Sequence, residues 1–522
     1  MFHREKSLYV RFKGIKCTSY NSNSIPMNGT ERIVDRSQKK HLHKQAKERS
    51  AKNVILEKIN PVLLTDVYNL CHQDFKINTD WEVSHIYNRN SPMILYGFNK
   101  TIEYIFDKMQ ITYDNIREAE RYASEMNVWF PSELFYTIVD DLNGYMPVNI
   151  QAIPDGNWVP RGTPFCQIRN TVKGFGERIW RNWRRMCDLV GGNVDTCMFP
   201  SACATQAFYM RRYLDSKKLS ANRFHSFGFR GHRSLEDAYW AGTAWNLFLP
   251  GTDDFHTKKY TTNASISSIP ALAHKVVEQF DSELKCYIRA IDQTAIHGKK
   301  YVSIVIDTFD TDNFIDKYAE RIAKYAASKG VKPVFRPDSG NTLEHTISIW
   351  RKCHKWNPTF IIGNEMNFEK AKQYNRFLEI NDIPLQNMTY GIGGGFYNDL
   401  IRDTLGWAMK TAYSNGKNRM KFSANKQSIP GKVEVVKDRY GQICVHQEDM
   451  NIQGYLPMYM NVYHHTKDPS AHYCNTDIWS TIQSRALEYL SVRELQNEMI
   501  LSNQIKDEIE YIRHKGKHHI IT

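Results

Sequence analysis

Short apolar runs alternate with longer helical patterns between residues 301 and 410. Four runs rich in Val, Ile, Phe and Tyr are too short to be helices, and a helical spacing of apolar residues follows them. They begin about 25 to 32 residues apart, the pitch of strand-helix units in a parallel sheet or barrel. The pattern therefore predicts parallel strands at 301–307, 332–336, 359–363 and 388–391.

Two helices matter most in this run. The first is expected after the third strand. Its apolar residues recur at a helical spacing that predicts one buried face, made of Met366, Phe368, Ala371, Tyr374, Phe377 and Leu378. The second is expected to follow the fourth strand, over residues 396–409.

Polar or glycine-rich turns follow all four strands. They are Asp307-Thr308-Phe309-Asp310, Arg336-Pro337-Asp338-Ser339-Gly340, Gly363-Asn364-Glu365 and Gly391-Ile392-Gly393-Gly394-Gly395. Any one of these turns alone is typical of an ordinary loop. Ligands of parallel α/β folds bind beyond the carboxyl ends of the strands, so four such turns in phase predict one site for a phosphorylated ribose.

The rest of the chain is expected to contain both helices and strands. The pattern indicates mainly helix over 53–130, a small antiparallel sheet over 147–171, helices over 174–190 and 201–219, a strand and helix over 223–248, a hairpin over 433–445 and helices over 476–513. The expected domains are an extension (1–52), a mixed N-terminal domain (53–190, with a contribution from 430–522), a catalytic α/β barrel (191–430) and a C-terminal hairpin with helices (431–522).

Composition indicates a globular protein. Of 522 residues, 41% are hydrophobic and 12% aromatic, and no uninterrupted apolar stretch is long enough to span a bilayer. No signal-peptide pattern is evident near Met1. The ten cysteines are scattered without a C-x-x-C pair, which favours a reducing, cytoplasmic setting over a disulfide scaffold or a zinc site.

The positive charge is concentrated at the N-terminus. The net charge is +13, and residues 1–52 hold 13 Lys and Arg against 4 Asp and Glu. The bland interpretation is a solvated flexible extension. Contact with nucleic acid or organelle targeting is the sharper alternative, but the tail has neither interleaved aromatic residues nor a clean amphipathic face.

Several motifs resemble the nicotinate and nicotinamide phosphoribosyltransferase family, and most closely its nicotinamide-specific members. They follow one another in the family's order: Thr65-Asp66-Val67-Tyr68, Pro154-Asp155-Gly156, Pro160-Arg161-Gly162, Phe227-Gly228-Phe229-Arg230-Gly231, Gly251-Thr252-Asp253, Pro270-Ala271 with His274, Arg336-Pro337-Asp338-Ser339-Gly340, the glycine turn, and Ser428-Ile429-Pro430-Gly431-Lys432.

The resemblance implies a fold and a reaction. The fold is α/β, an incomplete barrel of the type II phosphoribosyltransferase kind with an N-terminal domain of helices and antiparallel sheet. The reaction joins nicotinamide to phosphoribosyl pyrophosphate, giving nicotinamide mononucleotide and pyrophosphate for NAD salvage. A homodimer with shared active sites, Mg²⁺, and ATP use through a phosphorylated histidine are also implied.

The resemblance also implies residue roles. Phe227 and the partner's Tyr68 would stack on the pyridine ring, and Asp253 would accept a hydrogen bond from the carboxamide. The other roles are phosphate binding by Arg230, Arg336, Gly393, Gly394, Gly395, Arg402 and Lys410, ribose binding by Asp338, Gly363 and Asn364, ordering of Mg²⁺ or Arg336 by Asp307, a substrate contact by Ser303, and phosphoryl transfer by His274. No metal ligand set is predicted.

The chain departs from the family pattern in several places. The family's Gly-Asp-Gly is Gly363-Asn364-Glu365 here, and Ser226 replaces an aspartate. Ala273 replaces the acidic residue before His274, with Lys275 after it, and Ile392 replaces a small polar residue.

Two alternatives stay open. Transfer to nicotinate is the sister activity, which the charge of Asp253 disfavours because nicotinate carries a carboxylate. An inactive homologue serving as a binding protein is the other, and the joint presence of Arg230, Asp253, His274 and Arg336 disfavours it.

Overall fold

The computed structural model describes residues 60–63, 67, 81–102, 110–171, 198–261, 264–401, 403–423, 426–448, 450, 453–465, 473–474 and 477–519. Contacts between Cα atoms separate residues 1–59 from the unit 60–522. The basic extension and the helix expected over 174–190 lie outside the described residues. Within the described part, no helix combines the length and the apolar character needed to cross a membrane.

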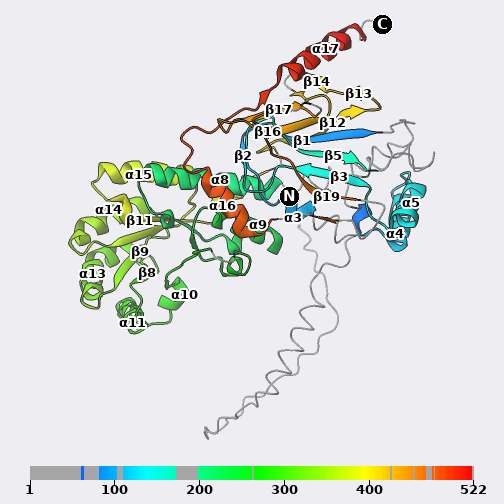
Figure 1. Cartoon of the computed structure of the whole chain (residues 1–522). Coiled ribbons are helices and arrows are strands. Elements are labelled where there is room, and N and C mark those ends of the chain that lie inside the picture. Colours follow the sequence, from blue (N-terminus) through cyan, green and yellow to red (C-terminus); the bar gives the residue numbers. More distant parts are fainter. Residues whose placement is uncertain are drawn as a thin grey trace, which may run out of the picture. The chain divides into compact units, whose positions relative to one another are not determined.

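A six-stranded parallel sheet carries the four predicted strands (Figure 1). Its spatial order is β7 (Gly251–Thr252), β6 (Phe224–Ser226), β11 (Met388–Ile392), β10 (Thr359–Ile362), β9 (Lys332–Arg336) and β8 (Tyr301–Val305). The strands from β9 to β11 are almost wholly buried, which explains their continuous apolar runs. The predicted parallel fold is confirmed.

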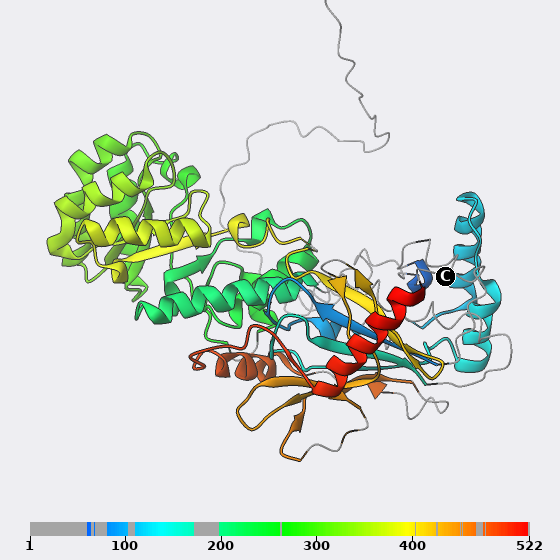
Figure 2. The same ribbon diagram turned by 90° about the horizontal axis from the view of Figure 1, so that it is seen from above.

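Helices pack beside this sheet (Figures 1 and 2). They are α8 (Met198–Ser216), α9 (Leu235–Asn246), α11 (Glu283–Ile296), α13 (Ala319–Ser328), α14 (Thr342–Cys353) and α15 (Phe368–Ile380). In α15, Ala371 and Leu378 are buried as predicted, whereas Phe377 is 53% exposed. The prediction for Phe377 is wrong because the buried face of this helix is narrower than the apolar spacing suggested.

The segment 266–272 bonds to both edges of the parallel sheet. On one side, Ser267 pairs with β7, where the Thr252 N–H donates to Ser267 O at 3.0 Å. On the other side, Ala271 pairs with Ser303 of β8, and the Leu272 N–H donates to Ser303 O at 2.9 Å. This irregular segment therefore bridges the two outermost strands and curls the sheet into a small barrel.

A seven-stranded antiparallel sheet forms the other main layer. Its order is β13 (Lys417–Asn418), β12 (Trp407–Ser414), β1 (Glu82–Asn88), β5 (Pro164–Asn170), β3 (Val148–Ala152), β19 (Met460–His464) and β20 (Tyr473–Cys474). The sheet predicted over 147–171 is confirmed and extended by strands from distant parts of the chain. Together the two sheets give the predicted α/β fold with a barrel part and an antiparallel part.

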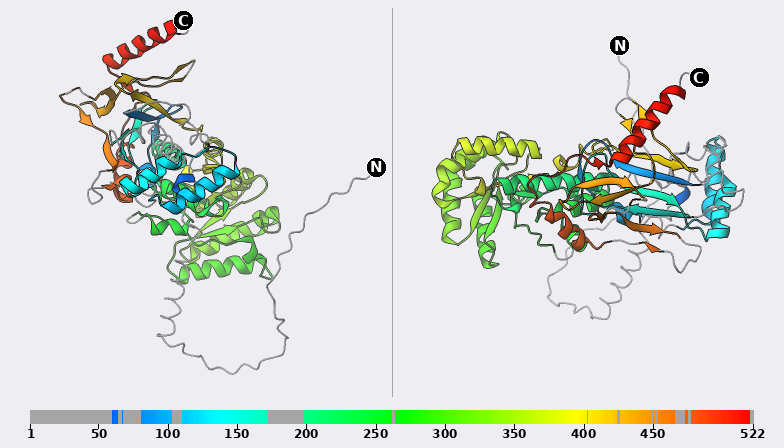
Figure 3. Two further views of the ribbon diagram at one scale, coloured as in Figure 1. Left: turned by 90° about the vertical axis from the view of Figure 1, so that its right-hand side faces the viewer. Right: turned by 45° about the horizontal axis from the view of Figure 1, so that its top comes forward.

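Two helical predictions fail at this sheet. Residues 82–88 were expected within a mainly helical region but form β1, all seven residues of which are buried. Burial on both faces removes the polar-apolar alternation by which a strand is recognised. The helix expected over 396–409 is also wrong, because Trp407 begins β12, which pairs with β1. Helix α4 (Tyr113–Glu125) does lie in the expected helical region, and α5 (Ser132–Leu142) follows just beyond it (Figure 3).

Smaller elements complete the described chain. The hairpin predicted over 433–445 is confirmed as β16 (Val433–Lys437) and β17 (Ile443–Gln447), joined by β18 (Leu456–Pro457) and β21 (Ile500–Leu501). The others are η1 (Pro61–Leu63), α3 (Phe98–Ile102), α16 (Trp479–Glu488), α17 (Asn503–His519), α12 (Thr311–Asn313), a π-helical turn η7 (Phe314–Tyr318), η4 (Ala221–Arg223), η6 (Phe255–Lys259), η8 (His354–Trp356), η9 (Leu385–Asn387) and the small sheets β2 (Met93–Ile94) with β4 (Trp158–Val159) and β14 (Phe422–Ser423) with β15 (Lys426–Gln427).

Candidate active site

The carboxyl ends of the parallel strands bring several predicted site residues together. Gly363, after β10, is the point where they meet. A Cβ built on it would lie 3.5 Å from Asp338 Oδ1, 3.8 Å from Gly391 O and 3.9 Å from Phe227 Cδ2. Side chains or backbone from β9, β11 and β6 thus converge on one turn, as the sequence predicted.

Phe227 extends β6 across the end of β11. Its N–H donates to Ile392 O at 2.9 Å, and its ring lies against Gly391. A Cβ at Gly391 would approach Phe227 Cε2 to 2.1 Å, so a side chain there is incompatible with this ring position. The ring of His225 lies 5.0 Å from that of Phe227. The Phe227 ring can therefore lie in this position only because Gly391 has no side chain.

Asp253 follows β7 beside β6. Its Oδ1 accepts hydrogen bonds from His225 Nε2 at 3.0 Å and from the Ser268 hydroxyl. Burial raises the pKa of Asp253, but these two bonds and the charges of His225 and Arg336 outweigh it and lower the pKa below its ordinary value. Asp253 is thus a carboxylate, 45% exposed, and His225 donates to it through Nε2–H.

His274 is paired with a carboxylate. It is the first residue of α10 (His274–Val277), and its Nε2 lies 3.2 Å from Asp307 Oδ1. The Asp307 side chain is only 2% exposed, and its Oδ2 accepts from the Ser339 hydroxyl. The orienting carboxylate that Ala273 cannot supply thus comes from the end of β8 instead.

Arg336, at the end of β9, points toward the bridging segment. Its Nη2 donates to Leu272 O at 2.7 Å. Its Nε is buried and finds no hydrogen-bond acceptor in the described part of the chain, and the same is true of the hydroxyls of Ser303 and Thr308. Because buried polar groups are normally paired, these three indicate a missing polar partner such as an anion or ordered water.

The turn after β10 keeps a glycine-like backbone without the glycine. Glu365 has φ of +48°, the left-handed region that glycine adopts most easily. The preceding Asn364 has its carbonyl bonded by Lys370 Nζ at 3.2 Å. Glu365 therefore has a backbone conformation that the last glycine of the family's Gly-Asp-Gly pattern would adopt more easily.

The glycine turn is compact but begins no long helix. Gly394 opens the single turn η10 (Gly394–Phe396), and a Cβ on Gly395 would approach Met366 O to 2.3 Å. Lys410 does not follow a helix over 396–409, as expected, but lies on β12 opposite His85. Tyr68 and Arg402 lie outside the described residues.

Arg230 lies in the turn η5 (Phe229–Gly231) that follows Phe227, and it is exposed. The turn is packed against Tyr397, whose hydroxyl donates to Gly228 O at 2.9 Å. The Tyr397 ring stacks on His232 at 4.0 Å. Burial, with nearby acidic side chains, raises the pKa of Tyr397 to about 12, so its hydroxyl stays protonated as a donor.

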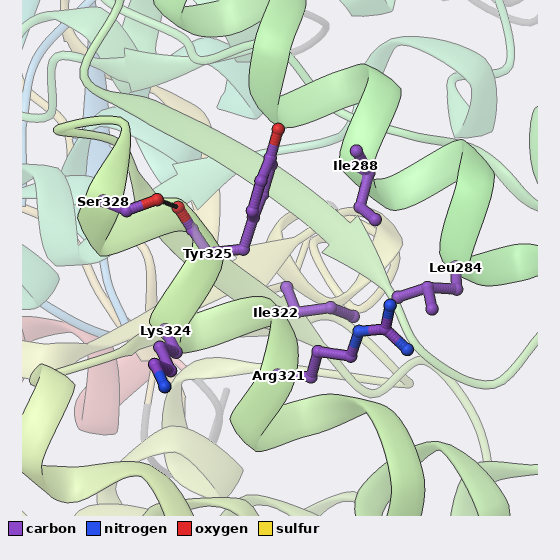
Figure 4. A pocket seen from close by; sticks show the side chains of 7 residues that line it. All are labelled: Leu284, Ile288, Arg321, Ile322, Lys324, Tyr325 and Ser328. Atoms are coloured by element: carbon purple, nitrogen blue, oxygen red, sulfur yellow. Dashed lines mark hydrogen bonds between the residues drawn. The ribbon is translucent and has the colours of Figure 1, made fainter.

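Two hollows lie outside the cluster of Phe227, Asp253 and Arg336, although Gly395 of the glycine turn lines the larger of the two. One, of about 340 Å³ between α11 and α13, is lined by Leu284, Ile288, Arg321, Ile322, Lys324, Tyr325 and Ser328 (Figure 4). The Tyr325 hydroxyl donates to Asp292 and the Ser328 hydroxyl to Tyr325 O, so both polar groups are already used. The other, of about 660 Å³, lies between α8, α15 and the segment after the glycine turn. Neither is lined by Phe227, Asp253 or Arg336.

Comparison with known proteins agrees with this geometry. Residues 222–440 match the family described as nicotinate phosphoribosyltransferase (NAPRTase). The matched residues include all six strands of the parallel sheet.

The curated relatives that this chain resembles are distant in sequence. The nicotinamide phosphoribosyltransferase of Acinetobacter baylyi is 24% identical over 358 residues, which is 57% of this chain and 69% of the relative. That of Xanthomonas campestris is 23% identical over 414 residues, which is 73% of this chain and 88% of the relative.

Solved structures with a similar fold are also distant in sequence. Human nicotinic acid phosphoribosyltransferase has a TM-score of 0.57 at 14% identity, covering 86% of this chain and 100% of that one. Nicotinate-nucleotide pyrophosphorylase from Pyrococcus furiosus has a TM-score of 0.54 at 15% identity, covering 84% and 97%.

The structure adds residues that the sequence reasoning did not select for the candidate site. His225 and Ser268 hold Asp253, Tyr397 holds the turn of Arg230, and Asp254 is bonded to Ser226. A signal existed for His225, since it falls in the short strand predicted after residue 223. Its contact with Asp253 depends on β6 and β7 being parallel neighbours, which spacing alone does not reveal.

Proposed function

We propose that this phosphoribosyltransferase transfers the phosphoribosyl group of phosphoribosyl pyrophosphate to nicotinamide, giving nicotinamide mononucleotide and pyrophosphate. The observation that carries the proposal is the carboxylate of Asp253, held unprotonated by His225 and Ser268 beside Phe227. The names of the two bacterial relatives agree with this substrate.

Recognition of the pyridine would use Phe227 and Asp253. The ring would stack on Phe227, which contributes about 0.5–1.5 kcal/mol beyond burial. Asp253 Oδ1 already accepts two bonds, so Oδ2 would accept the carboxamide N–H. A nicotinate carboxylate in the same place would face a like charge, which disfavours the acid.

Transfer itself depends on position and charge. The pyridine nitrogen attacks C1 of the ribose as the bond to pyrophosphate breaks, so the chain must hold both groups close and stabilise the leaving anion. Arg336 and Arg230 would bind that anion, since guanidinium groups bind phosphate oxygens in a bidentate manner. Asp338 and Asn364 would bind the ribose hydroxyls, and the backbone of Gly393, Gly394 and Gly395 the 5′-phosphate.

Mg²⁺ fits these residues as an ion carried with the substrate. The described residues contain no group of three or more His, Cys, Asp or Glu arranged to hold a metal. Mg²⁺ commonly binds through substrate phosphates, waters and one or two carboxylates, and Asp307 or Asp338 would suit that role. When bound, the ion would neutralise charge on the leaving pyrophosphate.

ATP use is proposed through His274. Asp307 fixes the orientation of the imidazole, as carboxylates do for catalytic histidines. Phosphorylation of His274 would couple ATP hydrolysis to the transfer.

We further propose a homodimer with shared sites. Lys410 belongs to the seven-stranded sheet and Arg336 to the six-stranded sheet. In the proposed dimer Lys410 and Tyr68 would serve the partner's site. Mixing inactive Arg336→Ala and Lys410→Ala chains should then restore about a quarter of wild-type activity by forming one intact site per heterodimer. No recovery on mixing would contradict shared sites.

One assay tests the function. Purified protein is given phosphoribosyl pyrophosphate and Mg²⁺ with nicotinamide or nicotinate, with and without ATP. We expect a higher kcat/KM for nicotinamide. A preference for nicotinate would identify the sister activity, and no product from either substrate would reject the proposal.

A further inference from the structure

Asp254 is a buried carboxylate behind the turn that carries Phe227 and Arg230. It is 1% exposed, and no Lys or Arg forms an ion pair with it in the part of the chain that the structure describes. Burying a carboxylate without a cation is costly unless hydrogen bonds satisfy its oxygens. Such a group calls for an explanation beyond stability.

Both oxygens of Asp254 bind the same turn. Oδ2 accepts from the Ser226 hydroxyl at 2.7 Å, and Oδ1 accepts from the Phe229 N–H at 2.9 Å. Ser226 directly precedes Phe227, and Phe229 directly precedes Arg230. The single carboxylate therefore spans the residues on either side of the proposed ring-stacking and pyrophosphate-binding side chains.

Asp254 is itself rigidly held. Its N–H donates to the Thr252 hydroxyl at 2.9 Å, and its carbonyl accepts from the N–H and hydroxyl of Thr257. Its main chain is thus fixed at the end of β7, and its carboxylate reaches from there to the turn. The family pattern has an aspartate at the position of Ser226. In this chain the carboxylate is instead on Asp254, which accepts a hydrogen bond from the Ser226 hydroxyl.

We infer that Asp254 is a positioning residue that sets Arg230 and Phe227 for substrate binding, supplying from β7 the carboxylate that Ser226 lacks on β6. Bonds to an ionised acceptor are stronger than those between neutral groups, so they hold the turn better than a serine pair could. This inference rests on the proposed function for the identity of the bound phosphates.

The test exchanges the two residues. Asp254→Ser removes the carboxylate. Ser226→Asp adds a second carboxylate in place of the hydroxyl that lies 2.7 Å from Asp254 Oδ2. The double variant Ser226→Asp/Asp254→Ser restores a single carboxylate, now on β6. We expect each single variant to raise KM for phosphoribosyl pyrophosphate at least tenfold and the double variant to return within threefold of wild type. A double variant as impaired as the worse single variant would overturn the inference.

A matched control separates positioning from stability. Asp155 is also 1% exposed and accepts a backbone N–H, from Gly97 at 3.0 Å, far along the chain from the turn. Asp155→Ser should lower Tm while leaving KM for phosphoribosyl pyrophosphate unchanged. If Asp254→Ser lowers only Tm and kcat, with KM unchanged as in the control, Asp254 is structural and the inference fails.

Calorimetric binding of pyrophosphate distinguishes this inference from the proposed function. Asp254→Ser and Arg230→Ala should each weaken pyrophosphate binding, and the double variant should bind no more weakly than Arg230→Ala alone. Fully additive losses would contradict positioning through Arg230. Wild-type protein that binds pyrophosphate but transfers nothing would defeat the proposed function alone, and protein that binds none would overturn both.

Discussion

The Phe227 ring occupies the space where a side chain at Gly391 would lie, with Cε2 only 2.1 Å from an added Cβ. Gly391 lies on β11 and Phe227 directly follows the neighbouring parallel strand β6, so the ring position is set by the sheet and by an absent side chain together. This contact makes Gly391 a determinant of the proposed pyridine pocket although it has no side chain to contribute to binding.

Gly391→Ala should therefore displace Phe227. We expect kcat/KM for nicotinamide to fall by about 2- to 12-fold, the equivalent of the ~0.5–1.5 kcal/mol of a lost aromatic contact. Steady-state kinetics of Phe227→Leu and of the double variant provide the check. If displacement of the ring is the cause, Gly391→Ala should add no further loss to Phe227→Leu.

Asp253→Asn should weaken discrimination between nicotinamide and nicotinate. The change removes the charge that faces the acid and weakens bonds from His225 and Ser268, at a cost of about 1–3 kcal/mol in amide transfer. Because the pKa of Asp253 lies below its ordinary value, the side chain stays ionised at a pH where an ordinary aspartate begins to take up a proton. The wild-type preference for nicotinamide should therefore hold as the pH falls toward 4. An unchanged ratio of kcat/KM values in the variant would exclude Asp253 from the pocket.

His274→Ala should abolish ATP hydrolysis and leave slow transfer intact, because other residues bind the substrate phosphates. Asp307→Asn should reduce the phosphohistidine without removing it, since it loses only the charge that orients the imidazole. Labelling with γ-labelled ATP, followed by tests for acid-labile and base-stable label, measures both. Label that survives in His274→Ala would show that another residue accepts the phosphoryl group.

Glu365→Gly should stabilise the protein. The residue has φ of +48°, where a side chain costs about 1–2 kcal/mol, partly offset by the greater freedom of glycine in the unfolded chain. We expect a net gain of about 0.5–1 kcal/mol in the free energy of unfolding, measured with denaturant. Glu369→Gly in the first turn of α15 is the control and should destabilise instead.

His85 should make stability depend on pH. Burial lowers the pKa of His85 to about 4, partly opposed by its bond to Gln167 and reinforced by the charge of Arg169. Below about pH 6.5, His85 is protonated in the unfolded chain, whereas in the folded chain it stays neutral until the pH approaches 4. Stability is therefore complete above pH 6.5 and falls by roughly 3 kcal/mol as the pH drops toward 4.

The comparison uses His85→Gln. Removing the titrating group should flatten that fall in denaturant unfolding between pH 6.5 and 4, whatever the variant's stability at pH 7. The exposed His297→Gln is the matched control and should follow the wild type. Parallel curves for wild type and His85→Gln would refute the assignment.

The parallel strands could be predicted because burial on both faces gives uninterrupted apolar runs, as in β10. The same physics concealed β1, whose seven buried positions include Glu82 and His85 and so lack both an apolar run and an alternation. The turn after the second predicted strand singled out Arg336, whereas Phe227 and Asp253 were selected only through the family resemblance. The support from His225, Ser268 and Asp254 was not accessible, because those contacts depend on strand order and on an irregular segment with no periodic pattern.

The segment 266–272 is bonded to β7 and β8 almost wholly through main-chain groups, yet its Ser268 hydroxyl reaches Asp253. Apart from Leu272, which packs against the hydrophobic core, its side chains belong to neither core cluster of the described residues. Mutational libraries confined to positions 266, 268 and 269 should alter which pyridine is accepted while the protein keeps its melting temperature. In this fold, substrate choice can evolve in a segment of the barrel wall whose side chains are not fixed by the pairing of its main chain with β7 and β8.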